Sequence, residues 1–208
     1  MVSDKKNAQK YAYEFIRDRM LDGTFEGGMK IVEERLAQDI GVSRTPIREA
    51  IRRLEQEGLI KNKHIYNPTV EDLKYLYEMR ILLESFAAEK AAKSMTPEMM
   101  KELRNTIKES RSARSESIYN ATQRFHDIIV NECHNPSMIT ILEKARTIFY
   151  LFSLKFDIYK RPLLIDEHEE IYSAIKDRNE QLAGELMAKH LYNDMNFTLA
   201  EISPEKAK

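Results

Sequence analysis

Residues 36–60 read LAQDIGVSRTPIREAIRRLEQEGLI, and their spacing predicts two short helices joined by a tight turn. In the first part, apolar residues recur at helical spacing until Gly41, which favours the end of a helix. Ser43 is a preferred helix N-cap, and Pro46 suits the first turn that follows, where a missing N–H costs little. We therefore expect a second helix that begins just after Ser43 and ends near Gly58.

The second helix is expected to be amphipathic. Its apolar face is formed by Ile47, Ala50, Ile51 and Leu54. Its other faces carry Arg44, Arg48, Arg52 and Arg53. Two helices joined by a Gly-Val-Ser turn, the second with arginines on its free face, are typical of a helix-turn-helix.

A helix of this kind is suited to DNA. Its N-terminal side chains can face base edges while its first N–H groups face a phosphate, and the planar fork of arginine binds guanine or phosphate. Residues 43–64 hold six basic residues against three acidic ones, whereas the whole chain has a net charge of −1. DNA binding would therefore depend on a local basic face. The alternative is a solvated arginine-rich helix on an ordinary helical bundle.

The rest of the chain is predicted to be mainly α-helical. Five of the six glycines lie before residue 60, which disfavours a turn-rich β fold in the remainder. Asn67-Pro68 is a turn signal, so we expect a DNA-binding domain over 1–68 and an all-helical domain over 69–208. The expected helices outside the opening stretch are 7–22, 70–94, 97–112, 116–133, 136–159, 162–178 and 180–201. The residues of helix 70–94 expected to face inward are Leu73, Leu76, Tyr77, Ile81, Leu82 and Phe86.

The composition also bears on location. No run of 18 apolar residues occurs, so no transmembrane helix is expected, and the N-terminus lacks the apolar core of a signal peptide. The single cysteine, Cys133, cannot build a disulfide framework. We expect a cytoplasmic protein without membrane partners.

Three histidines lie on apolar stripes of three different expected helices, namely His126, His168 and His190. A single histidine of this kind is more often a hydrogen-bonded core residue than a ligand. Three imidazoles that converged in one bundle core would suit a divalent ion such as Zn, Ni or Mn. Spacing alone leaves both interpretations open.

The run from Gly41 to Ala50, followed by Leu54 and Glu57-Gly58-Leu59, resembles the GntR family of bacterial winged-helix transcription regulators. The later pattern Leu-Tyr-Glu-Met-Arg at 76–80, followed by Leu-Glu at 83–84, resembles the all-helical FCD effector domain of the FadR subfamily. Together the two resemblances span roughly residues 8–200. They imply a winged helix-turn-helix domain followed by an effector-binding and dimerisation domain.

The resemblance and the arginine pattern together give a set of expected DNA-binding residues: Ser43, Arg44, Thr45, Arg48, Arg52, Lys61, Lys63 and His64. The chain departs from the family in the wing, for which only residues 60–67 are available, without a glycine. We expect a shortened wing in which Lys61, Lys63 and His64 contact phosphates only.

FCD domains similar to this one hold a metal with an Asp four residues before a Phe-His pair, and with one His on each of the last two helices. The pair matches Phe125-His126, and the two later positions match His168 and His190. Thr122 stands where the resemblance implies the Asp. Water or an effector carboxylate would fill the remaining positions around the ion.

Two arginines lie near these helices. Family patterns place an arginine at Arg80, where it would bind a carboxylate effector; the alternative is an ion pair with Glu84 at i+4. Arg161, next to Lys160, is expected to lie in a solvated loop.

These inferences predict a homodimeric regulator, by analogy a repressor, that binds a palindromic operator and senses a small organic acid at a metal. One alternative is a metal-free sensor with the same DNA-binding function. A second is a metal-dependent hydrolase, which the lack of an HExxH pattern around His168 disfavours. We therefore expect no enzymatic activity.

Overall fold

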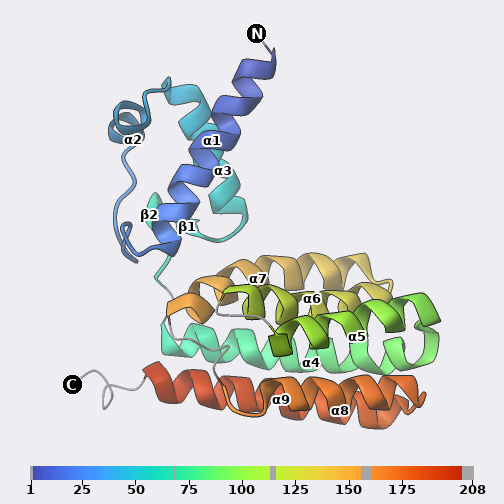
Figure 1. The fold of residues 1–208 in the computed structure, drawn as a ribbon. Coiled ribbons are helices and arrows are strands. Elements are labelled where there is room, and N and C mark those ends of the chain that lie inside the picture. The colour runs from blue at the N-terminus through green and yellow to red at the C-terminus, as the bar shows by residue number, and fades with distance from the viewer. Residues whose placement is uncertain (1, 68, 113–115, 156–160, 203–208) are drawn as a thin grey trace. The chain divides into compact units, whose positions relative to one another are not determined.

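A computed structural model describes residues 2–67, 69–112, 116–155 and 161–202 of the chain. It divides into two compact units, 1–69 with 146–151, and 70–145 with 152–208. Figure 1 shows that helices dominate both, which confirms the mainly α fold class. The elements of residues 1–69 are α1 (Val2–Leu21), α2 (Glu33–Ile40), α3 (Arg44–Gln56), β1 (Ile60–Lys61) and β2 (His64–Ile65). The later helices are α4 (Val70–Ser94), α5 (Pro97–Ser112), α6 (Glu116–Glu132), α7 (Pro136–Lys155), α8 (Leu164–Lys176) and α9 (Glu180–Ile202).

The core of the first unit lies between α1 and α3. Ile16 of α1, and Ile47 and Leu54 of α3, are completely buried. A polar contact joins the same two helices at their edge, because the Tyr13 hydroxyl donates to Glu57 Oε2 at 2.8 Å. The apolar face predicted for α3 is therefore the face that fixes this helix, which leaves its arginine-bearing faces outward.

The turn between α2 and α3 has the predicted helix end at Gly41 and N-cap at Ser43, but it lacks a capping hydrogen bond. Gly41 has φ +73°, a left-handed conformation that glycine adopts without strain, and its N–H donates to the Ala37 carbonyl at 3.0 Å. Ser43 occupies the N-cap of α3 as predicted, but its hydroxyl makes no capping hydrogen bond. Ser43 therefore begins the helix through its extended backbone conformation and not through a side-chain hydrogen bond. Its side chain is exposed.

The wing is a short hairpin, as expected from its length. Ile60 pairs with Ile65 and Lys61 with His64 in antiparallel register. Asn62 and Lys63 at the tip have φ of 53° and 61°, the two positive values that a two-residue hairpin turn with the right twist needs. A preceding segment widens this small sheet, since Ile31 N–H donates to the Lys63 carbonyl at 2.8 Å.

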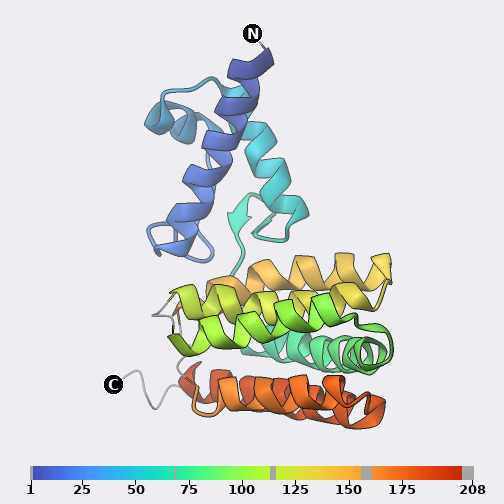
Figure 2. The same cartoon turned by 45° about the vertical axis from the view of Figure 1, so that its right-hand side comes forward.

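The helical bundle of the second unit is built around α4, which packs against α6, α8 and α9 (Figure 2). Small residues make the closest of these contacts possible. Ala87, Ala88, Ala91 and Ala92 of α4 are completely buried. On α9, a Cβ at Gly184 would lie 2.6 Å from Glu89 Oε1, so a larger residue there would require the Glu89 side chain to move.

The main difference from the sequence-based expectation lies on α4. Leu82 and Phe86, predicted to face inward, are 74% and 43% exposed. The core face of α4 is instead formed by the alanines and, one turn earlier, by buried Arg80 and Glu84. The prediction was right for Leu73 and Tyr77, which are 0% and 1% exposed. It was wrong for Leu82 and Phe86, where smaller side chains of the same helix form the closely packed face.

The other helix bounds agree with the predicted ones to within two or three residues, apart from α1, which begins earlier. The last part of the expected helix 136–159 lies outside the described residues. Within the described ranges, no helix combines the length and apolar character that crossing a lipid bilayer requires.

The core of the first unit makes a direct stability prediction. Leu54→Ala should lower the free energy of unfolding by about 2–5 kcal/mol, because it removes a fully buried side chain and leaves a cavity. Gln56→Ala, at an exposed position of the same helix, should change it by less than about 0.5 kcal/mol. Urea unfolding followed by circular dichroism measures both, and equal effects would contradict the assignment of the core.

Candidate metal centre and nucleic-acid interface

The arginines predicted to bind DNA lie on the outward face of α3. The side chains of Arg44, Arg48 and Arg52 are 59%, 55% and 62% exposed. Ser43 and Thr45, at the N-terminus of the helix, are also exposed. The first turns of α3 thus present hydroxyls and guanidiniums to the solvent, which is the arrangement that a recognition helix needs.

These guanidiniums are not free cations, because each contacts an acid. Arg44 pairs with Glu34, Arg48 Nε lies 3.3 Å from Glu33 Oε2, and Arg52 Nη1 lies 3.0 Å from Glu49 Oε1. All three pairs are largely exposed, and pairs of this kind contribute about 0–1 kcal/mol. A phosphate or a guanine can therefore take over these arginines at small cost.

Other basic residues of the first unit divide into two groups. Lys61, Lys63 and His64 of the wing are exposed, and His64 Nδ1 lies 2.8 Å from the Asn62 carbonyl. Arg53 has a structural environment instead: its guanidinium lies 3.9 Å from the Tyr13 ring centroid and its Nε donates to Glu57 at 2.9 Å. Arg53 thus helps to hold α1 against α3.

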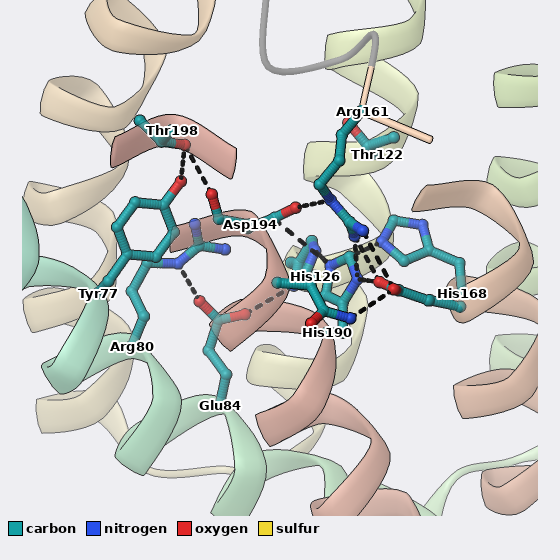
Figure 3. Close-up of polar contacts among 12 residues, drawn as sticks. Tyr77, Arg80, Glu84, Thr122, His126, Arg161, His168, His190, Asp194 and Thr198 are labelled. Carbon is teal, nitrogen blue, oxygen red and sulfur yellow. Dashed lines mark hydrogen bonds and ion pairs between the residues drawn. The ribbon is translucent and has the colours of Figure 1, made fainter. Parts of the chain in front are cut away.

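The second unit brings the three predicted histidines together, although they come from α6, α8 and α9 (Figure 3). His126, His168 and His190 are 6%, 1% and 1% exposed. His190 Nε2 lies 3.3 Å from His126 Nε2 and 3.2 Å from His168 Nε2. These separations match the roughly 3.3 Å expected between two nitrogens bound tetrahedrally at about 2.0–2.1 Å from one ion.

Two carboxylates fix the orientation of two of the rings. His126 Nδ1 lies 2.7 Å from Glu84 Oε2, and His190 Nδ1 lies 2.8 Å from Glu167 Oε2. A carboxylate only accepts, so an Nδ1 atom that bonds to it carries a proton and donates. His190 Nδ1 also lies 3.1 Å from Arg161 Nη2, which can only donate, and the shorter contact with Glu167 favours the protonated Nδ1. The Nε2 atoms of His126 and His190 then both present lone pairs, and they face each other at 3.3 Å. A cation bound between them would remove this repulsion, in the arrangement that is usual for metal-bound histidines.

The third ring is held by stacking. His168 lies parallel to Phe125, with ring centroids 4.1 Å apart and an interplanar angle of 8°. Its Nδ1 is buried and finds no hydrogen-bond partner among the described residues. Burial, together with the neighbouring imidazoles and guanidiniums, holds the pKa of His168 well below its usual value. Burial also lowers the pKa of His126, so both rings are neutral and able to bind a metal near pH 7.

An ion-pair network that the sequence did not indicate surrounds His190. Arg161 is 8% exposed, which corrects the expectation of a solvated loop. Its guanidinium pairs with Glu167, and its Nε donates to Asp194 Oδ1 at 2.6 Å. Asn193 Nδ2 also donates to Glu167, at 2.7 Å. The partners of Arg161 are 6 and 33 residues away, and neither separation is a helical spacing that would have predicted the pairs.

Arg80 and Glu84 form the i+4 pair that was one of the two expectations for Arg80. Arg80 Nε donates to Glu84 Oε1 at 2.6 Å, and both side chains are buried. Burial by itself would raise the pKa of Glu84, but the Arg80 guanidinium and the His126 ring hold it well below its usual range. Glu84 therefore stays ionised and links Arg80 to His126 of the histidine cluster, which is a different role from that of a surface pair.

Thr122 supplies a hydroxyl, and not a carboxylate, at the position where the resemblance implied an acid. Its hydroxyl donates to the Tyr119 carbonyl at 2.8 Å, within its own helix. The residues present still fit a divalent ion, since three neutral imidazoles converge and two of them are oriented by carboxylates. The identity of the ion is a separate question, because Zn, Ni and Mn all accept imidazole.

Comparisons with known proteins agree with this architecture. The model described as "Bacterial regulatory proteins, gntR family" matches residues 8–64, and the model described as "FCD domain" matches residues 75–193. The Nta operon transcriptional regulator of Aminobacter aminovorans is 30% identical over 179 residues, which cover 80% of this chain and 83% of that protein. The gluconate operon transcriptional repressor of Bacillus licheniformis is 24% identical over 200 residues, which cover 87% of this chain and 79% of that protein. The solved structure of E. coli McbR/YncC has a similar fold, with a TM-score of 0.75 at 18% identity over 94% of this chain and 99% of that one.

A winged helix-turn-helix followed by an all-helical effector-binding bundle defines a DNA-binding transcription regulator. The chain belongs to the GntR family, and its second unit is an FCD domain of the FadR-type subfamily. Membership of this family also makes it a regulator and not an enzyme, as the sequence led us to expect.

The contrast between buried and exposed ion pairs can be tested. Glu84→Gln should lower the free energy of unfolding of the metal-free protein by about 3–5 kcal/mol, because it leaves the buried Arg80 without its counter-charge. Glu49→Gln breaks the exposed pair with Arg52 and should cost less than about 1 kcal/mol. Chemical unfolding of both variants after dialysis against a chelator measures the difference, and a mild effect of Glu84→Gln would refute the pairing described for Arg80.

Proposed function

We propose that this regulator is a homodimeric repressor that binds a palindromic operator through α3 and responds to a small carboxylate at a divalent metal. The observation that carries the metal part is the convergence of the Nε2 atoms of His126, His168 and His190 in a buried core. In this proposal residues 1–68 read the DNA, and residues 69–208 hold the metal and the effector and form the dimer.

For DNA binding, we propose that the start of α3 enters the major groove. Arg44, Arg48 and Arg52 would contact bases and phosphates, with Ser43 and Thr45 placed at the N-terminus of the helix. Lys61, Lys63 and His64 of the short wing would contact phosphates, because their side chains are exposed and the hairpin is small. Two copies related by a two-fold axis would require a palindromic site.

Repression is supported by relatives. The matched proteins of Bacillus licheniformis and Bacillus subtilis are named gluconate operon transcriptional repressors. These names describe other proteins, and we propose by analogy with them that this chain also represses transcription.

For dimerisation, we propose that α4 packs against α4 of a second copy. Tyr75, Leu82 and Phe86 are exposed apolar residues at helical spacing along one side of α4. Exposed Glu71 and Glu78 lie toward its N-terminal end, and exposed Lys90 and Lys93 toward its C-terminal end. Antiparallel packing about a two-fold axis near Leu82 would bring opposite charges together while it covers the apolar side chains.

The charge of the metal centre supports an anionic effector. Glu84, Glu167 and Asp194 carry three negative charges, and Arg80 and Arg161 carry two positive charges, around histidines that include neutral His126 and His168. The site therefore has an excess of negative charge without a metal and an excess of positive charge with a divalent ion. A carboxylate would then neutralise the loaded site, with the metal and Arg80 as its partners. It changes DNA binding only if it favours one arrangement of the dimer over another.

The proposed role of α3 can be tested with charge-matched variants. Arg48→Ala should abolish specific binding in a gel-shift assay on duplexes selected from a random pool by the unmodified protein, because it removes a base or phosphate contact. Arg111→Ala removes an equally exposed arginine from α5 and should leave binding unchanged. Circular dichroism should show both variants folded. Undiminished binding by Arg48→Ala would defeat the assignment of α3 as the recognition helix.

The proposed metal site can be tested by removing and restoring the ion. Addition of Zn²⁺, Ni²⁺ or Mn²⁺ to chelator-treated protein should raise the unfolding free energy by about 2.7 kcal/mol when the free ion is at a hundred times its Kd. His168→Ala should remove this stabilisation, whereas His134→Ala, whose side chain is 76% exposed, should keep it. Elemental analysis of the purified proteins gives the stoichiometry. No bound metal, together with melting unchanged by chelation, would favour a metal-free sensor with the same DNA-binding function.

A further inference from the structure

Asp194 is a buried acid that lies one turn after His190 on α9. It is 6% exposed. One carboxylate oxygen, Oδ1, accepts a hydrogen bond from Arg161 Nε at 2.6 Å. The other, Oδ2, lies 3.6 Å from His190 Nε2, on the side of the ring where the three histidines converge. Figure 3 shows this carboxylate between Arg161 and the imidazoles.

The other two acids of the centre are placed differently. Glu84 and Glu167 contact the Nδ1 atoms of His126 and His190, so they lie behind the rings and orient them. Of these three acids, Asp194 alone has an oxygen near an Nε2 atom. Glu84 and Glu167 thus orient the histidine rings, whereas Asp194 lies where it could itself bind a metal.

The observed distance is compatible with coordination. Imidazole nitrogens and carboxylate oxygens bind zinc at about 2.0–2.2 Å, so neighbouring ligand atoms lie about 3.0–3.5 Å apart. The 3.6 Å between Asp194 Oδ2 and His190 Nε2 is just outside this range, so coordination would require the carboxylate to move toward the three histidines. The ion pair with Arg161 fixes Oδ1 and leaves the lone pairs of Oδ2 for the metal.

We propose that Asp194 is the carboxylate ligand of the metal centre, in the role that Thr122 on α6 cannot fill. The centre would then have three nitrogens and one oxygen, with the acid supplied by α9 and oriented by Arg161. This inference rests on the proposed metal function. A carboxylate in the ligand set also has a consequence for ion preference, because oxygen ligands favour Mn²⁺ more than they favour Zn²⁺ or Ni²⁺.

Metal affinities of three full-length proteins test the proposal, measured by isothermal titration with Mn²⁺ and with Zn²⁺ in competition with a chelator. Asp194→Asn should weaken Mn²⁺ binding by about 100-fold and Zn²⁺ binding by only about 10-fold, since a ligand oxygen is lost and the imidazoles remain. Glu167→Gln is the matched control, because Glu167 also pairs with Arg161 but faces an Nδ1 atom. It should weaken both ions by similar factors.

A second variant separates coordination from a structural role of Asp194. Position 122 lies one turn before His126 on the same face of α6, so Thr122→Asp can supply an oxygen from that side. Combined with Asp194→Asn, it should restore Mn²⁺ affinity to within about 10-fold of the unmodified protein. A carboxylate on α6 would restore nothing if Asp194 only held Arg161 in place.

The outcomes are distinct. Unchanged affinities of Asp194→Asn, or equal losses for both ions without restoration by Thr122→Asp, would overturn the role of Asp194. Failure of the unmodified protein to bind either ion would overturn the proposed metal function itself. Circular dichroism spectra confirm folding of each variant, and Arg161 keeps Glu167 as its partner when Asp194 is changed.

Discussion

The helical bundle depends on the way in which buried carboxylates orient buried imidazoles. Glu84 and Glu167 each accept a hydrogen bond from an Nδ1 atom, and this turns the Nε2 lone pairs of His126 and His190 toward one point. The acids are in turn neutralised by Arg80 and Arg161, which are themselves buried. Such a chain of ions in a low-dielectric core is stable only when every member has its partner. The site is therefore a network that spans α4, α6, α8 and α9.

The same network links two elements of the bundle that are remote in sequence. Tyr77 on α4 hydrogen-bonds Thr198 on α9 at 2.9 Å, and Thr198 donates to the Asp194 carbonyl. Arg80 follows Tyr77 by almost one turn and meets Glu84. The polar layer thus runs beside the alanine-rich contact between α4 and α9.

Much of the architecture could be predicted because its signals are local. Residues close together in the sequence predict the turn at Gly41, the apolar face of α3 and the starts of α5 and α7 at prolines. The structure has these features within a few residues of the predicted positions. The histidines could be named from their stripes, but their convergence came only from the family resemblance. Arg161 and Asp194 could not be found, because 33 residues separate them and no periodicity connects a loop to a distant helix. The burial of Leu82 and Phe86 was predicted wrongly because their size suggested burial, whereas the buried face of α4 is formed largely by alanines.

The glutamates beside the arginines that we propose contact DNA have a consequence for the way the protein would search a chromosome. Glu33 and Glu34 on α2, and Glu49 on α3, already occupy the guanidiniums that would otherwise be drawn to any polyanion. Nonspecific association depends on cations that displace counterions from the duplex, and each of these exposed pairs must open first, which lowers the nonspecific affinity by the small energy of the pair. At a matching site the base edges add hydrogen bonds that the DNA phosphates of a nonspecific site do not provide. In a chain with nearly balanced overall charge, a lower affinity for nonspecific DNA would increase the ratio of specific to nonspecific binding.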